Sequence, residues 1–399
     1  MNTESPMNIA PPRGFSIEEY QARLAKAQKL MAQQEMAAML LCTEPELRYY
    51  AGFHTPFWQS PTRPWFLILP QSGMPVAVIP QIGLAAMQTS WVEDIRCWPA
   101  PRPEDDGVSL LHETLWELAG QKGKIGVPMG HETHIRMPAK DFDRLRQTLG
   151  WERFLDATAI IRNQRMIKSP AEIAKIQHIC TLTSHVFDDL PNFVTPGDKE
   201  HEIFTKMRLA LLQAGADNVP YLVGASGQVN GVAGFRDIIK LPSDHILSKN
   251  DLLMLDTGAQ FDGYYCDFDR NFACEIVDDT TKIAYDMVFE ATEAGLEAAK
   301  IGTRTCDLFA AMNAVFIKYG KGEGDVGRFG HGLGMQLTEW PSHSRYDETI
   351  LEENMVITLE PGMLYGNNLI MLHEENIVIT QDGARLLTRR APAQIPIIQ

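Results

Sequence analysis

The chain has 399 residues, 45% of them hydrophobic, and a formal net charge of −15. That length suits two domains of ordinary size, and an acidic chain without a basic cluster argues against a nucleic-acid partner. The six cysteines form no Cys-x-x-Cys pair, the first residues lack a signal-peptide pattern, and no run of eighteen apolar residues occurs, so we expect a cytoplasmic protein with reduced thiols and no membrane partner.

The first 160 residues alternate between helix and strand patterns. A capping box from Ser16 to Glu19 opens a helix that we expect to run to about residue 34. Further apolar patterns predict strands over 37–41, 65–69 and 76–79, and helices over 45–50 and 110–119. Such alternation predicts an α/β domain over residues 1–160.

The connection over residues 52–65 is unusually aromatic and contains Phe57, Trp58 and Trp65. Aromatic side chains at this density pack against other protein surfaces more often than they face solvent. Two interpretations stay open: packing at a seam between domains or subunits, or a lid that supplies aromatic walls to a substrate site.

From residue 161 onward the pattern changes to longer helices interleaved with strands. Ser169 is placed to cap a helix whose first residue is Pro170. Helices are predicted over 171–190, 199–214, 281–299 and 304–319. We therefore place a second domain at residues 161–399.

Two aspartates, eleven residues apart, flank a hairpin signal in this second region. An apolar run over 252–255 leads into Asp256, Asp262-Gly263 is a turn signal, and the chain then returns toward Asp267. Antiparallel strands can bring both carboxylates together, where they either share a proton or bind a cation. Two surface acids beside a turn give the same pattern, so the pair alone does not decide.

Three later segments each present one further potential ligand. His331 lies in the glycine-rich stretch 330–334, Glu360 precedes Pro-Gly, and Glu374 follows an apolar run. Four carboxylates and one imidazole form an oxygen-rich set that balances the charge of two divalent ions. The sequence thus predicts a dinuclear metal site.

These motifs, in this order, resemble the pita-bread metallohydrolases that include methionine aminopeptidase, aminopeptidase P and prolidase. The preceding domain makes the aminopeptidase P, prolidase and creatinase branch the best match. The resemblance implies an α/β creatinase/prolidase-like N-terminal domain followed by an α+β pita-bread catalytic domain, and a homodimer. It also implies two divalent ions (manganese, cobalt, iron or zinc) held by five ligands: Asp256, Asp267, His331, Glu360 and Glu374.

The chain departs from the resembling peptidases at two accessory histidines. Peptidase members place a second histidine seven residues after the first, where it contacts the scissile carbonyl, and Thr338 stands there instead. No histidine occurs shortly before Pro242, and we expect His245 to lie on the surface. His343 is the best remaining substitute, although we expect a solvated loop residue.

Other residues near the motifs receive supporting roles. Strand alternation turns His373 and Glu375 away from Glu374, and places Asp269 on the same face as Asp267. We expect Asp269, balanced by Arg270, to support the ligands, with an exposed ion pair as the alternative. We expect the catalytic residues to be Glu360, His331 and Thr338, and Glu339 to be a further acid that supports the ligands. The expected substrate-binding aromatic residues are Phe57, Trp58, Trp65 and Trp340.

Two functions follow from these expectations. The first is a hydrolase that cleaves a peptide, of the Xaa-Pro kind, or another C–N bond, with a metal-bridging water and Glu360 as proton carrier. The second is a non-peptidase of the same fold, either a creatinase-like hydrolase of a small amide or a lyase of an onium compound such as dimethylsulfoniopropionate. The retained ligand motifs favour the first, whereas the missing histidines and the aromatic loop favour the second, because aromatic walls suit a cationic head. A third possibility, a metal-free binding protein on the same scaffold, is disfavoured by the five intact ligands.

Overall fold

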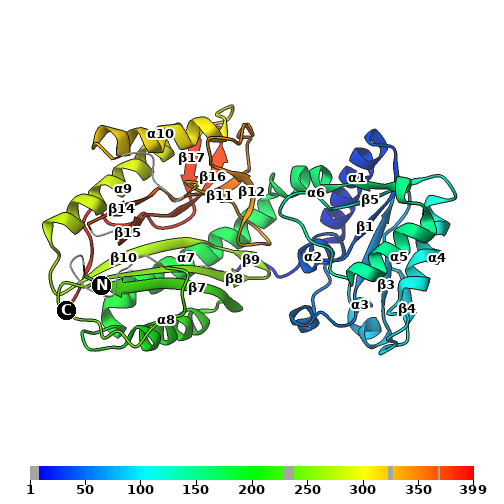
Figure 1. Cartoon of the computed structure of the whole chain (residues 1–399), viewed down its shortest axis with the longest axis horizontal. Helices are drawn as coiled ribbons and strands as arrows, with labels where there is room; N and C mark the ends of the chain where they lie inside the picture. The colour runs from blue at the N-terminus through cyan, green and yellow to red at the C-terminus, as the bar shows by residue number, and fades with distance from the viewer. Residues whose placement is uncertain (1–8, 229–237, 322–326, 367–368) are drawn as a thin grey trace. The chain divides into compact units, whose positions relative to one another are not determined.

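The computed structural model describes residues 9–228, 238–321, 327–366 and 369–399 (Figure 1). The chain folds as two compact units that divide between Arg165 and Met166. We call residues 12–165 the N-terminal unit and residues 166–399 the C-terminal unit; the short segment up to Pro11 groups with the latter.

The N-terminal unit is built on a six-stranded mixed sheet with the order β4-β3-β2-β1-β5-β6. Strand β1 pairs antiparallel with β2 and parallel with β5. The elements expected here all form, with ends shifted by at most two residues. Its elements are α1 (Ile17–Gln33), β1 (Met36–Leu41), α2 (Glu44–Ala51), η1 (Pro56–Gln59), β2 (Phe66–Pro70), β3 (Val76–Pro80), η2 (Gln81–Gly83), α3 (Leu84–Met87), β4 (Asp94–Trp98), α4 (Val108–Ala119), β5 (Lys124–Val127), α5 (Ala139–Leu149), η3 (Trp151–Arg153), β6 (Phe154–Asp156) and α6 (Thr158–Arg165).

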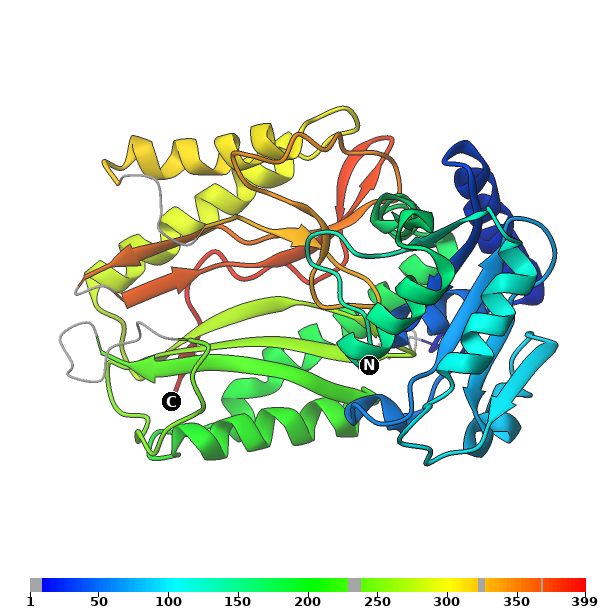
Figure 2. The same cartoon turned by 45° about the vertical axis from the view of Figure 1, so that its right-hand side comes forward.

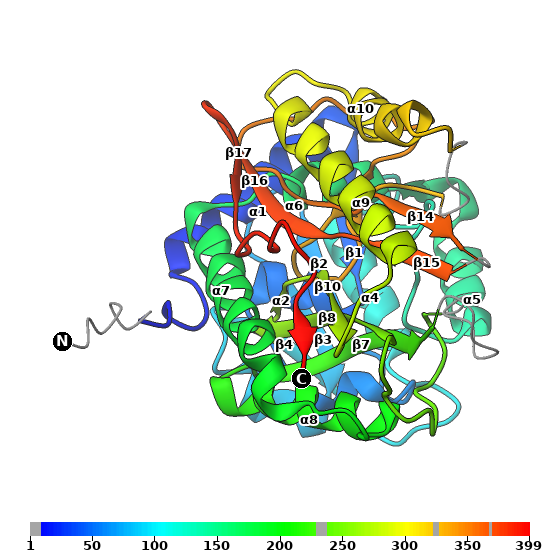
Figure 3. The same ribbon diagram turned by 90° about the vertical axis from the view of Figure 1, so that its left-hand side faces the viewer.

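The C-terminal unit holds two larger sheets, β18-β10-β8-β7 and β12-β11-β13-β16-β17, and the hairpin β14-β15. Helices α7 and α8 pack along the first sheet, as the green helices below the strands in Figure 2 show. Helix α9 lies across β13, β14 and β15 and packs beside α10 (Figure 3). The elements are α7 (Pro170–Phe193), α8 (Glu200–Ala214), β7 (Asn218–Gly227), β8 (Leu252–Phe261), β9 (Tyr264–Tyr265), β10 (Phe268–Cys274), α9 (Asp279–Ala298), α10 (Thr305–Lys318), β11 (His331–Gly332), β12 (Glu339–Ser342), β13 (Val356–Leu359), β14 (Gly362–Tyr365), β15 (Leu369–Leu372), β16 (Glu375–Thr380), β17 (Gly383–Leu386) and β18 (Ile397–Ile398).

Local sequence signals explain why the second unit begins where it does. Ser169 Oγ accepts from the Glu172 N–H at 3.3 Å, and Glu172 Oε2 accepts from the Ser169 N–H at 2.8 Å. This reciprocal cap satisfies backbone donors that the first helical turn leaves without partners, and Pro170 needs no donor there. The expected cap of α7 is therefore confirmed.

The core of the C-terminal unit lies between α9, α10 and the strands, and includes Met254, Val288, Met312, Phe316 and Ile357. All five side chains are buried, and each such side chain stabilises the fold by about 1.5–3 kcal/mol. Among the helices that the structure describes, none combines the length and the apolar character of a membrane span.

Candidate metal centre

The hairpin between β8 and β9 forms as expected. Asp262 and Gly263 both have positive φ angles, 48° and 80°, as a tight two-residue turn requires. Strand β10 then runs antiparallel to β8, with Asp269 opposite Asp256 and Asp267 immediately before β10. Of the two predicted aspartates, Asp256 thus lies on β8 and Asp267 lies directly before the start of its neighbour β10.

The other three predicted ligands come from the second sheet. His331 is the first residue of β11, and Glu360 directly follows β13. Glu374 directly precedes β16, and the pairing of Leu359 with Glu375 sets Glu360 and Glu374 beside each other at the ends of adjacent strands. Two sheets therefore bring together residues that lie more than one hundred positions apart.

The imidazole of His331 has a defined orientation. Its Nδ1 lies 2.8 Å from the Gly332 carbonyl oxygen, which can only accept, so Nδ1 carries the proton and Nε2 the lone pair. Nε2 lies 3.4 Å from Oδ2 of Asp267. One ligand atom each from Asp267, His331 and Glu374 lie within 4.8 Å of one another.

The electrostatics of this cluster favour a cation. Burial raises the pKa of Asp256 and of Glu374 well above its usual range, and the charge of Asp267 adds to both shifts. Burial also raises the pKa of Asp267. In half-buried Glu360, desolvation raises the pKa to about 7, opposed by nearby His331.

Several carboxylate oxygens in the cluster lack hydrogen-bond donors in the described parts of the chain. One oxygen each of Asp256, Asp267, Asp269 and Glu374 has no hydrogen-bond partner among the described residues. Buried anionic oxygens without donors are costly, and a divalent ion is the partner that such oxygens and an imidazole lone pair accept together. The residues present therefore fit a divalent metal centre.

Two residues that the sequence did not point to, Tyr221 and Asn376, hold the ligands in place. Tyr221 on β7 donates its hydroxyl to Asp256 Oδ2 at 3.0 Å. Asn376 on β16 binds both peptide groups of Asp267, accepting from its N–H at 2.9 Å and donating to its carbonyl. Strand alternation from Glu374 could have identified Asn376, whereas no local signal pointed to Tyr221.

The expectations for Asp269 and its neighbours are partly corrected. Asp269 is only 1% exposed, so the alternative of an exposed ion pair is wrong. Burial raises its pKa to about 7, with Arg270 acting in the opposite direction. The guanidinium itself pairs with Glu375 at 3.0 Å and donates to the Glu374 carbonyl at 2.9 Å.

His373 and Glu375 turn away from Glu374, as strand alternation predicted. His373 Nδ1 lies 3.0 Å from the Thr292 hydroxyl, and the Glu375 carboxylate accepts from Arg390 at 3.1 Å. Both side chains are thus engaged by residues outside the proposed ligand set.

Thr338 and His343, which follow His331 in the chain, both have surroundings that the sequence did not predict. Thr338 accepts a hydrogen bond from Arg328 Nη2 at 3.2 Å, a contact that the sequence did not reveal. His343 is fully buried against Gly330, so the expectation of a solvated loop histidine is wrong; burial lowers its pKa to about 3. A neutral imidazole at that place cannot supply positive charge to the site.

Glu339 and Trp340 both lie on β12. The buried carboxylate of Glu339 binds Lys168 Nζ at 3.3 Å and the Gln336 N–H at 3.1 Å. Trp340 is half-buried, and its carbonyl lies directly against Gly332. The supporting role of Glu339 and the substrate contact of Trp340 stay predictions.

The aromatic loop of the N-terminal unit is only partly available to a substrate. Trp65 is 1% exposed and packs against Phe53 and Trp58, so its expected role as a substrate wall is wrong. Phe57 is 39% exposed and Trp58 half-buried. A substrate contact of these two residues stays a prediction.

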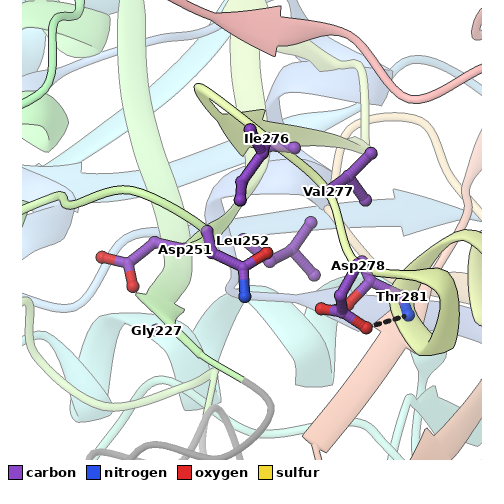
Figure 4. Close-up of a pocket in the computed structure, with 9 residues that line it drawn as sticks. Gly227, Asp251, Leu252, Ile276, Val277, Asp278 and Thr281 are labelled. Atoms are coloured by element: carbon purple, nitrogen blue, oxygen red, sulfur yellow. Dashed lines mark hydrogen bonds between the residues drawn. The ribbon is translucent and has the colours of Figure 1, made fainter.

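A small hollow at the start of β8 does not form a second site. It is lined by Gly227, Asp251, Leu252 and Asp278 among others, and Asp278 is engaged in capping α9 through Thr281 (Figure 4). Asp251 binds His245 Nε2 at 2.7 Å, and the His245 side chain is only 25% exposed. His245 is thus partly exposed, which is consistent with the expected surface position, and Asp251 holds its ring in place.

Comparison with known proteins shows that the chain is similar to peptidases in sequence and fold. The family model of metallopeptidase family M24 matches residues 174–381, and that of the creatinase/prolidase N-terminal domain matches residues 23–167. The Xaa-Pro dipeptidase of Pyrococcus furiosus is 31% identical over 290 residues, which are 71% of this chain and 77% of that protein. These matches favour the peptidase interpretation over the creatinase-like or lyase alternative.

Solved structures agree over nearly the whole length. Dipeptidase PepE from Mycobacterium ulcerans matches with a TM-score of 0.84 and 26% identity, over 96% of this chain and 99% of that chain. The prolidase from Pyrococcus horikoshii OT3 matches with a TM-score of 0.79 and 25% identity, over 94% and 100% of the two chains. The predicted fold, an α/β domain followed by a pita-bread catalytic domain, is confirmed.

Proposed function

Because the chain belongs to metallopeptidase family M24 and is a metal-dependent hydrolase, we propose that it is a dipeptidase for substrates of the Xaa-Pro type. We further propose that two divalent ions, with manganese the first to test, occupy the centre. Its ligands are Asp256, Asp267, His331, Glu360 and Glu374. The observation that carries this proposal is the approach of ligand atoms of Asp267, His331 and Glu374 to within 4.8 Å of one another, together with buried carboxylate oxygens of Asp256, Asp267 and Glu374 that have no donor among the described residues.

When bound, divalent ions lower the pKa of the attacking water and polarise the scissile carbonyl. The chain itself supplies the proton carrier. Glu360 is the one half-buried member of the set, so its carboxylate is placed to take a proton from water and deliver it to the leaving nitrogen.

Other residues orient the ligands. The Gly332 carbonyl fixes the tautomer of His331, Asn376 holds the backbone of Asp267, and Tyr221 restrains the carboxylate of Asp256. Such contacts keep ligands in one geometry and raise metal affinity. We propose that Asp269, one residue beyond Phe268, supports the set in the same way.

We also propose that the protein works in the cytoplasm as a homodimer, with Phe57, Trp58 and Trp340 at the substrate. Support for the compartment comes from the cysteines, all six of which are unpaired although four are buried.

The proposal of a dimer rests on the resemblance to the prolidase branch. Sedimentation at several protein concentrations tests it, and a monomer throughout would refute it.

The experiment for the activity is a substrate panel with the metal-loaded protein. It contains Xaa-Pro dipeptides, dipeptides without proline, creatine and dimethylsulfoniopropionate. We expect cleavage of the Xaa-Pro dipeptides and none of the last two. Turnover of creatine or of the sulfonium compound alone would replace the proposal with the non-peptidase alternative.

A further inference from the structure

Arg328 is a half-buried, positively charged residue beside the proposed centre. It is not one of the proposed metal ligands. It precedes His331 by three residues, and its Nη2 donates to Thr338 Oγ1 at 3.2 Å. This hydrogen bond therefore joins a residue that precedes His331, Arg328, to a residue that follows it, Thr338.

The backbone next to Arg328 is tied to the centre. The Phe329 carbonyl accepts from the Glu360 N–H at 3.0 Å, and the His331 N–H donates to Thr358 Oγ1 at 3.1 Å. The charge of Arg328 also contributes to lowering the pKa of Asp267 and of Glu360 against the larger effect of burial. The positive charge of the guanidinium therefore stabilises the ionised carboxylates of Asp267 and Glu360, although Arg328 is not itself a ligand.

Among the described residues, the guanidinium of Arg328 forms no structural ion pair. Arg270 and Arg390 in the same unit both pair with Glu375, at 3.0 and 3.1 Å. Within the described parts of the chain, Arg328 makes only the bond to Thr338. A guanidinium has five N–H donors in a planar fork, so donors remain for a ligand.

We propose that Arg328, positioned by Thr338, donates a hydrogen bond to the scissile carbonyl oxygen of the substrate and stabilises the negative charge that develops there. This inference rests on the proposed dipeptidase function. As water adds to the carbonyl carbon, the C=O electron pair moves to oxygen. When that pair returns, the C–N bond breaks, the nitrogen takes a proton, and Arg328 stays protonated throughout.

The chemistry explains how Thr338 can stand where an imidazole would be expected. A threonine hydroxyl carries no positive charge, and the buried His343 has its pKa lowered to about 3, so neither supplies a cation. An arginine stays charged over the whole working pH range. Its donor therefore needs no protonation equilibrium of its own.

The test compares R328A, R328K and R328Q with R208A, which removes an exposed arginine of α8 from the same unit. Substrates are Ala-Pro and Ala-Pro amide, which lacks the terminal carboxylate. We expect R328A and R328Q to lower kcat about 100-fold or more on both substrates, as loss of one preorganised donor does. R328K should keep part of the rate, and R208A all of it.

Two outcomes would overturn the inference while leaving the dipeptidase function intact. If R328A raises KM for Ala-Pro alone and leaves kcat unchanged, Arg328 binds the terminal carboxylate. If R328A and R328Q, folded by their Tm, match R208A, Arg328 has no part in the reaction.

A binding measurement gives a readout apart from turnover. A phosphinate analogue of Ala-Pro carries its negative charge on a tetrahedral centre, and calorimetry should show binding at least 10-fold weaker in R328A than in the wild type. Equal affinity would refute the inference. A wild type that neither cleaves Ala-Pro nor binds the phosphinate would instead refute the dipeptidase function.

Discussion

Asp267 is connected to the centre through both its side chain and its backbone. Its carboxylate lies within reach of His331 and Glu374, and Asn376 binds its backbone on both sides. A buried carboxylate fixed in this way has little freedom to turn toward solvent. Its position is therefore set before any ion arrives.

We predict that D267A abolishes dipeptide turnover, by roughly 100-fold or more, because a shared ligand is lost. Elemental analysis should show reduced metal content in the same sample. D382N, which removes one exposed carboxylate from the turn before β17, is the control and should behave as the wild type. Wild-type turnover in D267A would refute the assignment of Asp267.

The T338H variant tests whether the site lacks an imidazole. We predict no gain in kcat/KM on Xaa-Pro dipeptides, and a loss of about 10-fold, because the larger ring removes the acceptor that positions Arg328. An increase of tenfold or more would show instead that a histidine restores a missing contact and that Arg328 does not fill the role.

At the residue scale, sequence reasoning works where a motif carries the chemistry. Asp267 and His331 were predicted from local patterns, and the structure brings them together. The burial of Trp65 and of His343 was not predicted, because it depends on which distant segments pack over a loop. Arg328 was missed for the same reason, since its significance comes from Thr338 across the folded segment.

At the scale of elements, the centre depends on how two sheets are joined. Strand β10 belongs to one sheet and β16 to the other, and the Asn376 side chain connects them by imitating a backbone pairing with Asp267. Each sheet alone presents only part of the ligand set. The link between them therefore decides whether the ligands meet.

We predict that N376A lowers the free energy of unfolding by about 2–5 kcal/mol, because it leaves a buried N–H and a buried carbonyl of Asp267 without partners. Metal affinity should fall by about 10–100-fold. Urea denaturation and metal titration measure the two effects, with N192A, at an exposed asparagine of α7, as the control. Unchanged affinity in N376A would show that the link does not position Asp267.

Some helices and strands were predicted from the sequence, and others were not. The hairpin at Asp262-Gly263 has a turn signal and two apolar flanks, and it forms as predicted. Strand β4 carries charged residues at the sheet edge, and β6 has three residues, so neither shows an apolar run or a regular alternation. Pairing with neighbours, and not local pattern, makes these segments strands.

For the whole molecule, the centre links stability to both pH and metal. The pKa values of Glu360 and Asp269 are raised to about 7. A carboxyl group with a raised folded-state pKa contributes stability below its unfolded pKa, near 4, and loses it as the pH rises toward 7. The metal-free protein should therefore become less stable between about pH 4 and pH 7.

Divalent ions should reverse this loss, since they replace protons as partners of the carboxylates. We predict that manganese raises the Tm more at pH 8 than at pH 5.5, with chelator-treated protein as the reference. The difference between the two increments should shrink in D267A. Equal increments at both pH values in the wild type would contradict the coupling.

The most direct test of the account is a metal titration of activity. Chelator-stripped protein is supplied with increasing equivalents of manganese, and hydrolysis of an Xaa-Pro dipeptide is followed at each step alongside bound metal. We predict no turnover without metal and a rise that saturates as the five-residue centre of each chain fills. Undiminished turnover by the stripped protein, or none by the fully loaded protein, would contradict it.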